Sequence, residues 1–311
     1  MKQLPAIAIH GGAGTISKER MTPGRESAYK KALAEARDIG FEILKKGGKA
    51  IDAVEAAVIS LENTPLFNAG KGSVFSANGT HEMDAAIMDG HTLEAGAVAG
   101  IRKVRNPVSV ARLVYQHSPH VMLSGTGAED FARKHGASLA SDAELFDAYR
   151  FQQWLRVKGR ETVALDHTED LEEDKKFGTV GAVACDLQGH LAAATSTGGM
   201  TNKRYGRIGD SPIIGVGTYA EDSSCAISCT GHGEPFIRAV AAYDVVARMR
   251  YLGLNLQEAC RQTVHERLMK FEGEGGLIAV DAEGNIAMPF NARGMYRAWK
   301  RGKEAGGVAI Y

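Results

Sequence analysis

The sequence lacks several features that would assign it to a familiar class at once. Its formal net charge is zero, with 37 Lys and Arg against 37 Asp and Glu, so no excess of one sign indicates a nucleic acid or an anionic membrane as partner. No apolar run approaches the ~20 residues that a membrane-spanning helix needs. Walker lysine, GxSxG, HExxH and strand-associated GxGxxG motifs are also missing. The composition therefore excludes the most easily recognised nucleotide, serine-hydrolase and zinc-protease signatures.

Cysteine is scarce and is not spaced as in a metal site. The four cysteines are Cys185, Cys225, Cys229 and Cys260. We expect them to be reduced and mostly buried, because residues 1–14 predict a first strand and not a secretory signal. The expected location is therefore cytoplasmic. His117 and His120 have a poor spacing for a two-histidine metal helix, so we expect no catalytic zinc there.

Glycine, by contrast, is abundant. It supplies 37 of the 311 residues, roughly 12% against an average near 7%. Its non-periodic clusters indicate places where the backbone turns with positive φ or approaches another group closely. These clusters are HGGAG (10–14), NAGKG (68–72), EAGAVAG (94–100), STGGM (196–200) and CTGHG (229–233).

Hydrophobic periodicity predicts strands and helices in both halves of the chain. The predicted strands are 5–10, 72–77, 84–88, 94–101, 179–186, 190–196, 213–219, 225–230, 276–281 and 285–289. The predicted helices are 25–46, 49–63, 107–117, 126–135, 143–157, 234–250 and 255–270. An acidic stretch at about 159–178 separates the two halves. We predict two sheets between helices, formed as one domain from segments 1–178 and 179–311, with the acidic linker at the surface.

The junction between the acidic linker and the next strand has the composition of a self-cleaving site. Thr179 follows Gly178 directly and opens an apolar stretch. Attack of the Thr179 hydroxyl on the Gly178 carbonyl, followed by hydrolysis, would free the Thr179 amine, so that one residue supplies nucleophile and base. A free α-amine titrates at about 7.7–8.0, near working pH. An ordinary loop that opens a strand with Gly-Thr is the alternative.

Three segments downstream carry polar groups that such a nucleophile needs. Thr197 ends the next strand and would orient the nucleophile. Arg207 and Asp210 would hold the carboxylate and the ammonium of an amino-acid head group. Backbone N–H groups at Thr230 and Gly231, just before a helix, would stabilise an oxyanion. Each feature alone also fits a structural role, as a strand-end threonine, a surface ion pair or a glycine turn.

Taken together, the order and spacing of these segments resemble the plant-type L-asparaginase/isoaspartyl peptidase family of N-terminal-nucleophile (Ntn) hydrolases. The resemblance rests on GTVGAVA (178–184), STGGMTNK (196–203), GRIGDSP (206–212) and SCTGHGE (228–234), and it extends to IAIHGGAG (7–14), PLFNAGKGSVF (65–75), HEMDAAIMDG (81–90) and RNPVSVAR (105–112). It covers nearly the whole chain. It implies an α+β fold of the four-layer αββα sandwich type.

The resemblance also implies residue roles. Cleavage would fall between Gly178 and Thr179, and the catalytic residues would be Thr179 as nucleophile, Thr197, Thr230 and Gly231. The substrate-binding residues would be Arg207, Asp210, Gly233 and Asn68, with Gly233 near the substrate amine and Asn68 lining the nucleophile. A loop would hold a structural sodium ion through the backbone carbonyls of Leu61, Glu62, Thr64, Phe67, Ala69 and Lys71. No cofactor for catalysis is implied.

Two positions depart from the family pattern. Arg204-Tyr205 stands where many relatives have Leu-Pro, which would alter the approach to Arg207. His232 occupies a variable position and receives no role. The linker is divergent and strongly acidic, so the rate of self-cleavage does not follow from the resemblance.

The implied activity is that of a self-processing threonine hydrolase. It would hydrolyse β-aspartyl (isoaspartyl) dipeptides and L-asparagine through a β-aspartyl ester of Thr179. Its partners would be these small molecules and a second copy, in a dimer of processed αβ units. Two alternatives stay open. One is a glycosylasparaginase, which the GGMTNK segment, the sodium-type loop and the missing secretory signal disfavour. The other is an uncleaved, non-catalytic amino-acid-binding protein that uses Arg207 and Asp210 alone.

Overall fold

Two sheets form the centre of the molecule. The computed structural model describes residues 4–14, 16, 18–19, 21–158 and 178–311, so the predicted surface position of the linker lies outside the described residues. In spatial order, the eight-stranded sheet contains β12 (Gly307–Ala309), β11 (Gly294–Arg301), β1 (Ala6–Gly14), β5 (Thr179–Cys185), β6 (Leu191–Thr197), β2 (Met83–Asp89), β3 (Ala95–Ile101) and β4 (Met122–Ser124). The four-stranded sheet contains β10 (Ile286–Ala287), β9 (Gly275–Asp281), β8 (Cys225–Gly231) and β7 (Thr218–Ala220).

Helices lie in both halves of the described chain. The α-helices are α1 (Pro23–Lys45), α2 (Ala50–Glu62), α3 (Pro107–His117), α4 (Gly125–Lys134), α5 (Asp142–Leu145), α6 (Ala148–Val157), α7 (Gly233–Ala239), α8 (Ala241–Leu252) and α9 (Leu256–Gln262). Shorter 3-10 turns occur at Gly70–Gly72 and Leu268–Phe271, and a π-helical turn occurs at Thr263–Arg267. Among the described residues, none of these helices has the length and apolar character to cross a bilayer.

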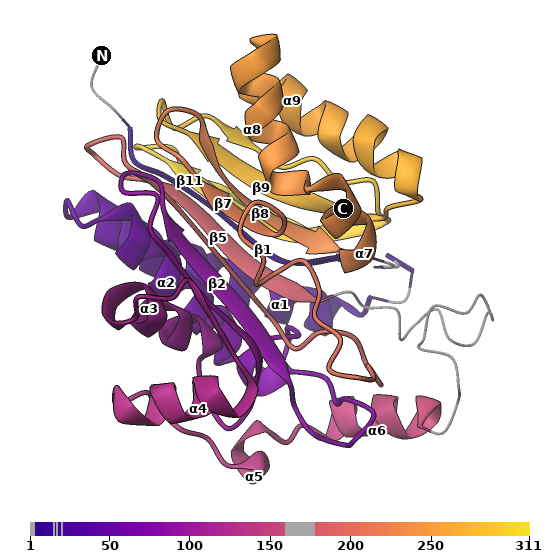
Figure 1. Ribbon diagram of the computed structural model, residues 1–311. Coiled ribbons are helices and arrows are strands. Elements are labelled where there is room, and N and C mark those ends of the chain that lie inside the picture. Colours follow the sequence, from indigo (N-terminus) through magenta and orange to yellow (C-terminus); the bar gives the residue numbers. More distant parts are fainter. Residues whose placement is uncertain (1–3, 15, 17, 20, 159–177) are drawn as a thin grey trace.

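The elements are stacked in layers because alternate strand residues point to opposite faces. In β5, Val180, Ala182 and Ala184 pack toward α1, α2 and α3, whereas Val183 and Cys185 pack against the four-stranded sheet. The outer face of that sheet is covered by residues of α7, α8 and α9. Figure 1 shows α8 and α9 over the four-stranded sheet and α1 and α2 on the opposite side of the molecule. The predicted α+β class is confirmed, and all four cysteines are buried and free.

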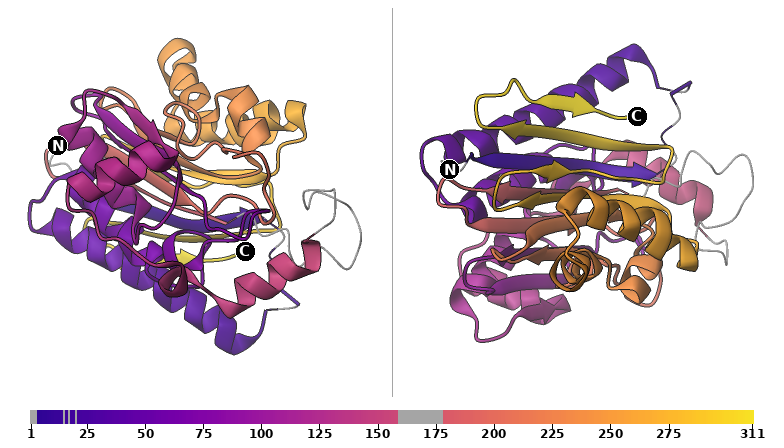
Figure 2. Two further views of the ribbon diagram at one scale, coloured as in Figure 1. Left: turned by 60° about the horizontal axis from the view of Figure 1, so that its bottom comes forward. Right: turned by 90° about the horizontal axis from the view of Figure 1, so that it is seen from above.

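Strands from both sides of the linker are interleaved in the large sheet. β1 pairs antiparallel with β11, near the C-terminus, and with β5, directly after the linker. The right view of Figure 2 shows the C-terminal strands beside the indigo β1. The two segments therefore share one hydrogen-bonded sheet, and a break between Gly178 and Thr179 would leave these strand pairings in place.

The sheets approach each other closely behind Thr179. A Cβ on Gly181 would collide with Ser228 Oγ and with His10 Nε2. Glycine at this position of β5 is therefore required by the neighbouring sheet, not by backbone angles. The close approach brings polar groups of β1, β5 and β8 within hydrogen-bond distance of one another.

The prediction of a strand at 72–77 was wrong. The backbone N–H groups of this segment donate to nearby loop residues and not to a neighbouring strand. Ser73 N donates to Gly70 O at 3.1 Å, and Ser76 N donates to Thr80 O at 2.8 Å. Val74 N donates to the Asn68 side chain at 3.0 Å. The apolar residues Val74 and Phe75 are buried, although they belong to a loop and not to a strand.

Three predicted helices are interrupted. The predicted helix 143–157 divides into α5 and α6, because Asp147 caps α6 by accepting from Arg150 N at 2.9 Å. The predicted helix 234–250 divides at Val240, which has a left-handed φ of 51°. The predicted helix 255–270 is α-helical only through α9 and continues as π and 3-10 turns.

The extents of the strands also needed correction. The predicted strands 213–219 and 285–289 shrink to β7 and β10, and the sequence did not predict β4, β11 or β12. β11 is rich in basic residues, which hid its strand character. Arg297 and Lys300 nevertheless lie over the rings of Phe290 and Phe41, each at 4.8 Å, so their stems are half-buried beside the sheet.

Candidate active site

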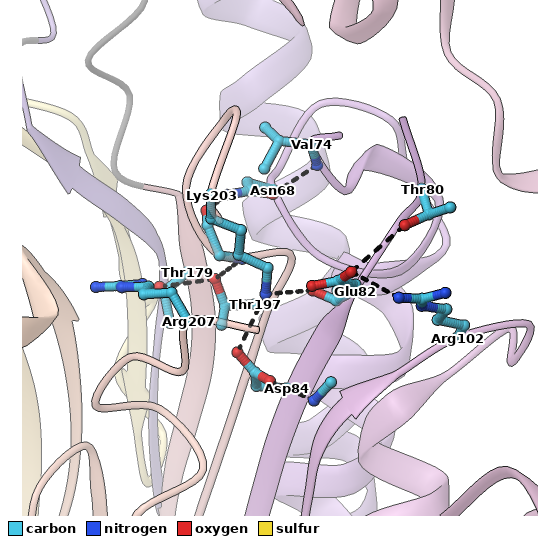
Figure 3. Close-up of polar contacts among 12 residues, drawn as sticks. Asn68, Val74, Thr80, Glu82, Asp84, Arg102, Thr179, Thr197, Lys203 and Arg207 are labelled. Carbon is cyan, nitrogen blue, oxygen red and sulfur yellow. Dashed lines mark hydrogen bonds and ion pairs between the residues drawn. The ribbon is translucent and has the colours of Figure 1, made fainter. Parts of the chain in front are cut away.

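Thr179 and Thr197 face each other across neighbouring strands. The antiparallel register of β5 and β6 pairs these two residues directly. Thr179 Oγ1 donates to Thr197 Oγ1 at 3.2 Å, and both side chains are buried. Thr197 Oγ1 also accepts from Gly199 N at 3.0 Å. The expected proximity of the two hydroxyls is therefore present in the structure (Figure 3).

The carbonyl of Gly178 belongs to the same hydrogen-bond chain. Thr197 Oγ1 donates to Gly178 O at 3.0 Å, so one hydroxyl contacts both the predicted nucleophile and the predicted scissile carbonyl. A Cβ on Gly178 would collide with the Asn68 side chain. Glycine thus lets the chain pass Asn68 on its way into β5.

Asn68 fixes the loop that follows Thr197. Its side-chain Nδ2 donates to Gly199 O at 2.6 Å, and its backbone carbonyl oxygen accepts from Gly198 N at 3.0 Å. The side chain is buried and also accepts from Val74 N. The structure therefore brings Asn68 to Gly178 and to the Gly198–Gly199 loop, which is the neighbourhood of Thr179.

A buried ion pair lies beside the threonines, and the sequence analysis did not identify it. Asp84 in β2 pairs in register with Thr197. Lys203 Nζ donates to Glu82 O at 2.7 Å and lies 3.8 Å from Asp84 Oδ2. Burial raises the pKa of Asp84, and Lys203 opposes this shift. A carboxylate inside the apolar strand MDAAIMD was the signal that could have identified this pair (Figure 3).

A chain of hydrogen bonds joins the Thr179 backbone to the second sheet. His10 Nδ1 donates to Thr179 O at 3.0 Å, and His10 Nε2 lies 2.9 Å from Ser228 Oγ. Burial lowers the pKa of His10 to about 3, so the imidazole is neutral, and Ser228 must donate to Nε2. Ser228 in turn contacts Thr195 Oγ1 at 2.7 Å, and Thr218 Oγ1 donates to Thr195 Oγ1 at 2.6 Å.

Thr230 and Gly231 lie at the same end of the sandwich as Thr179. His10 links β5 to Ser228, and Thr230 lies two residues beyond Ser228, where its Oγ1 accepts from Ala13 N at 3.3 Å. β1 and β5 are antiparallel, so the step from His10 to Ala13 runs toward Thr179. Gly231 has a φ of 151°, and a Cβ there would collide with Glu274 O.

Arg207 is held by a residue to which the sequence analysis gave no role. Its Nε and Nη2 donate to the two carboxylate oxygens of Glu234 at 2.9 and 2.8 Å. His232 Nε2 lies 3.0 Å from Glu234 Oε2. Burial alone would raise the pKa of Glu234, but the bonds from His232 and Arg207 outweigh it and lower that pKa well below its usual range. Arg207 uses one edge of its guanidinium here, and Nη1 lies over Gly209.

Asp210 is a buried carboxylate with an oxygen that lacks a partner. Only 4% of the residue is exposed, and within the described residues Oδ2 makes no hydrogen bond. Burial raises the pKa of Asp210 to about 7, although nearby Arg207 opposes the shift. A Cβ on Gly233 would lie 2.8 Å from Arg207 Nη2 and 3.1 Å from Asp210 Oδ1. Gly233 therefore leaves open the space between the two charged groups.

The loop predicted to hold sodium follows α2. A Cβ on Gly70 would lie 2.5 Å from Glu62 O, and a Cβ on Gly72 would collide with Phe67 O. The loop therefore folds back tightly on the end of α2, which contains Leu61 and Glu62. Backbone carbonyls would form an all-oxygen donor set, which suits a hard cation, and the sodium ion that the resemblance implies stays a prediction.

Tyr205 does not cover the site. Its side chain is fully exposed, and its backbone has a left-handed φ of 58°. The Arg204-Tyr205 departure thus places an aromatic ring in solvent at the turn before Arg207.

Comparison with known proteins shows which family the chain resembles over nearly its whole length. A family model described as asparaginase matches residues 3–310. The chain is 53% identical to an isoaspartyl peptidase of Escherichia coli strain K12 over 306 residues, which cover 98% of this chain and 95% of the relative. It is 42% identical to a probable isoaspartyl peptidase/L-asparaginase 2 of Arabidopsis thaliana, with 94% of each chain covered. It is also 42% identical to an isoaspartyl peptidase/L-asparaginase of Rattus norvegicus, over 98% of this chain and 89% of the relative.

Proposed function

This chain belongs to the asparaginase family, and on that premise we propose that it is a threonine hydrolase of isoaspartyl dipeptides and L-asparagine. The observation that carries the proposal is the hydrogen-bonded chain from Thr179 Oγ1 through Thr197 Oγ1 to Gly178 O. In this chain one hydroxyl lies between the proposed nucleophile and the carbonyl of the peptide bond whose cleavage would free that nucleophile's amine. The names of the relatives supply the substrate class.

Activation begins with attack of Thr179 Oγ1 on the Gly178 carbonyl carbon. The Thr179 proton passes toward Thr197, and the Thr197 hydroxyl stabilises the charge that develops on Gly178 O. Collapse breaks the peptide C–N bond and leaves an ester between Gly178 and Thr179, with the proton on the new amine. Water then hydrolyses the ester, giving a Gly178 carboxylate and a free Thr179 amine. The products are segments 1–178 and 179–311, which together form one domain.

Substrate hydrolysis uses the same hydroxyl. The Thr179 amine takes the hydroxyl proton as Oγ1 attacks the β-carbonyl of the substrate. Thr230 and Gly231 stabilise the oxyanion. The leaving amine, either ammonia or the amine of the following residue, departs with a proton and leaves a β-aspartyl ester on Thr179, which water hydrolyses to aspartate.

The substrate head group is recognised by opposite charges. Arg207 binds the α-carboxylate through the guanidinium edge that Glu234 does not use, a charge-assisted contact. The α-ammonium supplies Asp210 Oδ2 with the donor that it lacks among the described residues. Gly233 leaves room for the carbon that carries both groups, and Asn68 positions the loop beside the nucleophile.

Finer features of the proposal follow the family. We assign the layered fold to the αββα sandwich of Ntn hydrolases, and we propose that two processed units assemble as a dimer. The structural sodium would be held by the backbone carbonyls of Leu61, Glu62, Thr64, Phe67, Ala69 and Lys71, where it would hold the loop that carries Asn68. The cytoplasmic location stays a prediction.

A kinetic comparison of β-Asp-Leu, L-asparagine and L-glutamine tests the function. The dipeptide should be hydrolysed at least as efficiently as asparagine, because the two substrates share a head group and differ only in the leaving amine. Glutamine should react about a hundredfold more slowly, since one extra methylene moves its carbonyl away from Thr179. Strong preference for asparagine over the dipeptide, or rapid hydrolysis of glutamine, would overturn the assignment. An intact chain without turnover would favour the non-catalytic binding protein.

A further inference from the structure

A second cluster of functional side chains lies at the opposite end of the sandwich from Thr179. His91 lies in the turn between β2 and β3, His190 precedes β6, and Asp222 lies between β7 and β8. Their ligand atoms all lie within 4.8 Å of one another. Thr197 is at the far end of β6 from His190, a separation of about 20 Å at the rise of a β-strand. The cluster is therefore not part of the hydrolase site.

The carboxylate of Asp222 stands between the two imidazoles. Its Oδ2 lies 2.8 Å from His190 Nδ1 and 3.3 Å from His91 Nδ1, and the two rings lie 4.0 Å apart. On a tetrahedral zinc ion with bonds of ~2.0–2.1 Å, ligand atoms lie about 3.3 Å apart. The two distances from Asp222 Oδ2 lie within about 0.5 Å of this value, and all the ligand atoms lie within 4.8 Å of one another. From these contacts we propose that His91, His190 and Asp222 form a binding site for a divalent transition-metal ion of the zinc class.

Hydrogen bonds between and within the turns position Asp222 and His91 without the metal. Asp222 Oδ1 accepts from Leu191 N at 2.8 Å, which leaves Oδ2 directed at the imidazoles. Asp222 N donates to Gly90 O at 3.0 Å, and Gly90 N donates to Leu191 O at 2.7 Å. His91 N donates to the side chain of Asp89 at 2.9 Å. Second-sphere bonds of this kind orient metal ligands.

Gly90 makes the convergence of the three turns possible. A Cβ at this position would lie 2.9 Å from both Asp222 Oδ1 and Leu191 O. Any side chain here would push the Asp222 turn away from the histidines. The cluster could not be identified from the sequence, because its members come from three separate turns with no local metal-type spacing.

The ligand set predicts which ions bind. Two imidazoles and one carboxylate suit Zn²⁺, Co²⁺, Ni²⁺ or Cu²⁺, whereas Mg²⁺ and Ca²⁺ prefer sites made of oxygen. The side chains are 61%, 39% and 26% exposed for His91, His190 and Asp222, so an ion can enter and retain water as a further ligand. The histidines lie in turns of the large sheet and Asp222 lies in a turn of the small one, so a bound ion would join the two sheets.

Titration of untagged protein, first treated with a chelator, tests the site. Calorimetry with Zn²⁺ and visible absorption with Co²⁺ should give one ion per chain, with no competition from Mg²⁺. Because binding only to the folded state stabilises it, Zn²⁺ should raise the Tm by several degrees. Hydrolysis of β-Asp-Leu should be the same with and without the chelator.

Variants identify the ligands. Asp222→Asn, which keeps the bond from Leu191 N, and His190→Ala should each weaken Zn²⁺ binding at least tenfold and remove the rise in Tm. His91→Ala should do the same, and its exposed side chain makes it the variant least able to disturb folding. Gly90→Ala should weaken binding although all three ligands remain.

His117→Ala is the matched control, since His117 stacks on His135 elsewhere on the surface, and it should bind Zn²⁺ like the wild type. Wild-type binding no tighter than that of His91→Ala, or equal weakening by His117→Ala, would overturn the proposal.

Discussion

The nucleophile and the head-group clamp of the candidate site are built in different ways. Thr179 and Thr197 lie on adjacent strands, and the register of β5 and β6 alone brings their hydroxyls together. Arg207 and Asp210 lie in the connection between β6 and β7 and take their positions from side-chain pairing and burial. The sheet therefore positions the proposed nucleophile, and loops position the proposed clamp.

This difference separates two steps that share one hydroxyl. The proposed self-cleavage uses Thr179, Thr197 and the Gly178 carbonyl, which are already in contact in the uncut chain. The proposed turnover uses the clamp as well, because Arg207 and Asp210 would position the substrate by its charged head group. Variants of the clamp should therefore affect turnover but not cleavage, whereas variants of the nucleophile should affect both.

The largest expected effect is that of Thr179→Ala. The variant should remain a single chain and show no hydrolysis of β-Asp-Leu, because it lacks both the attacking hydroxyl and the reaction that frees the amine. Thr179→Ser is the matched control and should retain some cleavage. Electrophoresis and a coupled assay for released leucine measure the two properties. Turnover by uncut Thr179→Ala would contradict the account.

Arg207→Ala should separate cleavage from turnover. Loss of a charge-assisted contact to the substrate carboxylate in a mostly desolvated site costs on the order of 2–4 kcal/mol, or about 30- to 1000-fold in kcat/KM. Cleavage should proceed as in the wild type, since no bound amino acid takes part in it. A variant that cleaves itself normally and hydrolyses β-Asp-Leu with near wild-type efficiency would show that Arg207 is not the carboxylate clamp.

The pKa of Asp210 predicts how ligand binding depends on pH. Burial raises this pKa to about 7, so lowering the pH through 7 protonates the carboxyl and removes the charge that binds the ammonium. The Kd of the product L-aspartate should therefore rise about tenfold between pH 8 and pH 6. Succinate, which has no ammonium group, is the control, and its binding should not weaken in this way. Calorimetry on both ligands decides the matter, and equal weakening of the two would assign the pH dependence to another group.

Glu234→Gln should have the smallest effect. Glu234 orients the Arg207 guanidinium through two bonds but is itself 47% exposed, so the net contribution of the pair is screened by solvent. The KM for β-Asp-Leu should rise about three- to tenfold with little change in kcat. A larger fall in kcat than in substrate affinity would indicate that Glu234 contacts the reacting groups.

The proximity of Thr179 and Thr197 could be predicted from the sequence because their pairing is local. Thr179 and Thr197 lie equally far from the turn at Asp186–His190, so a simple hairpin brings them opposite each other, and the structure has this register. Cys225 and Cys229 were likewise predicted correctly to be buried.

The remaining features depend on contacts between distant segments. Glu234 lies 27 residues after Arg207 in the sequence, and no periodicity indicates that pairing. Lys203 lies in the loop after β6 and pairs with Asp84 of β2. β11 was missed because its basic residues hide its strand character, and its partner β1 lies at the other end of the sequence. The apolar pattern of Val74 and Phe75 predicted a strand. The Val74 N–H donates instead to the Asn68 side chain and is not available to a neighbouring strand.

Intact-mass measurement of purified, aged protein tests the proposed self-cleavage. Two chains are expected whose break lies between Gly178 and Thr179, so that the second chain begins Thr-Val-Gly-Ala. A preparation that hydrolyses β-Asp-Leu while its chain remains intact, or a second chain that begins at any other residue, would contradict it.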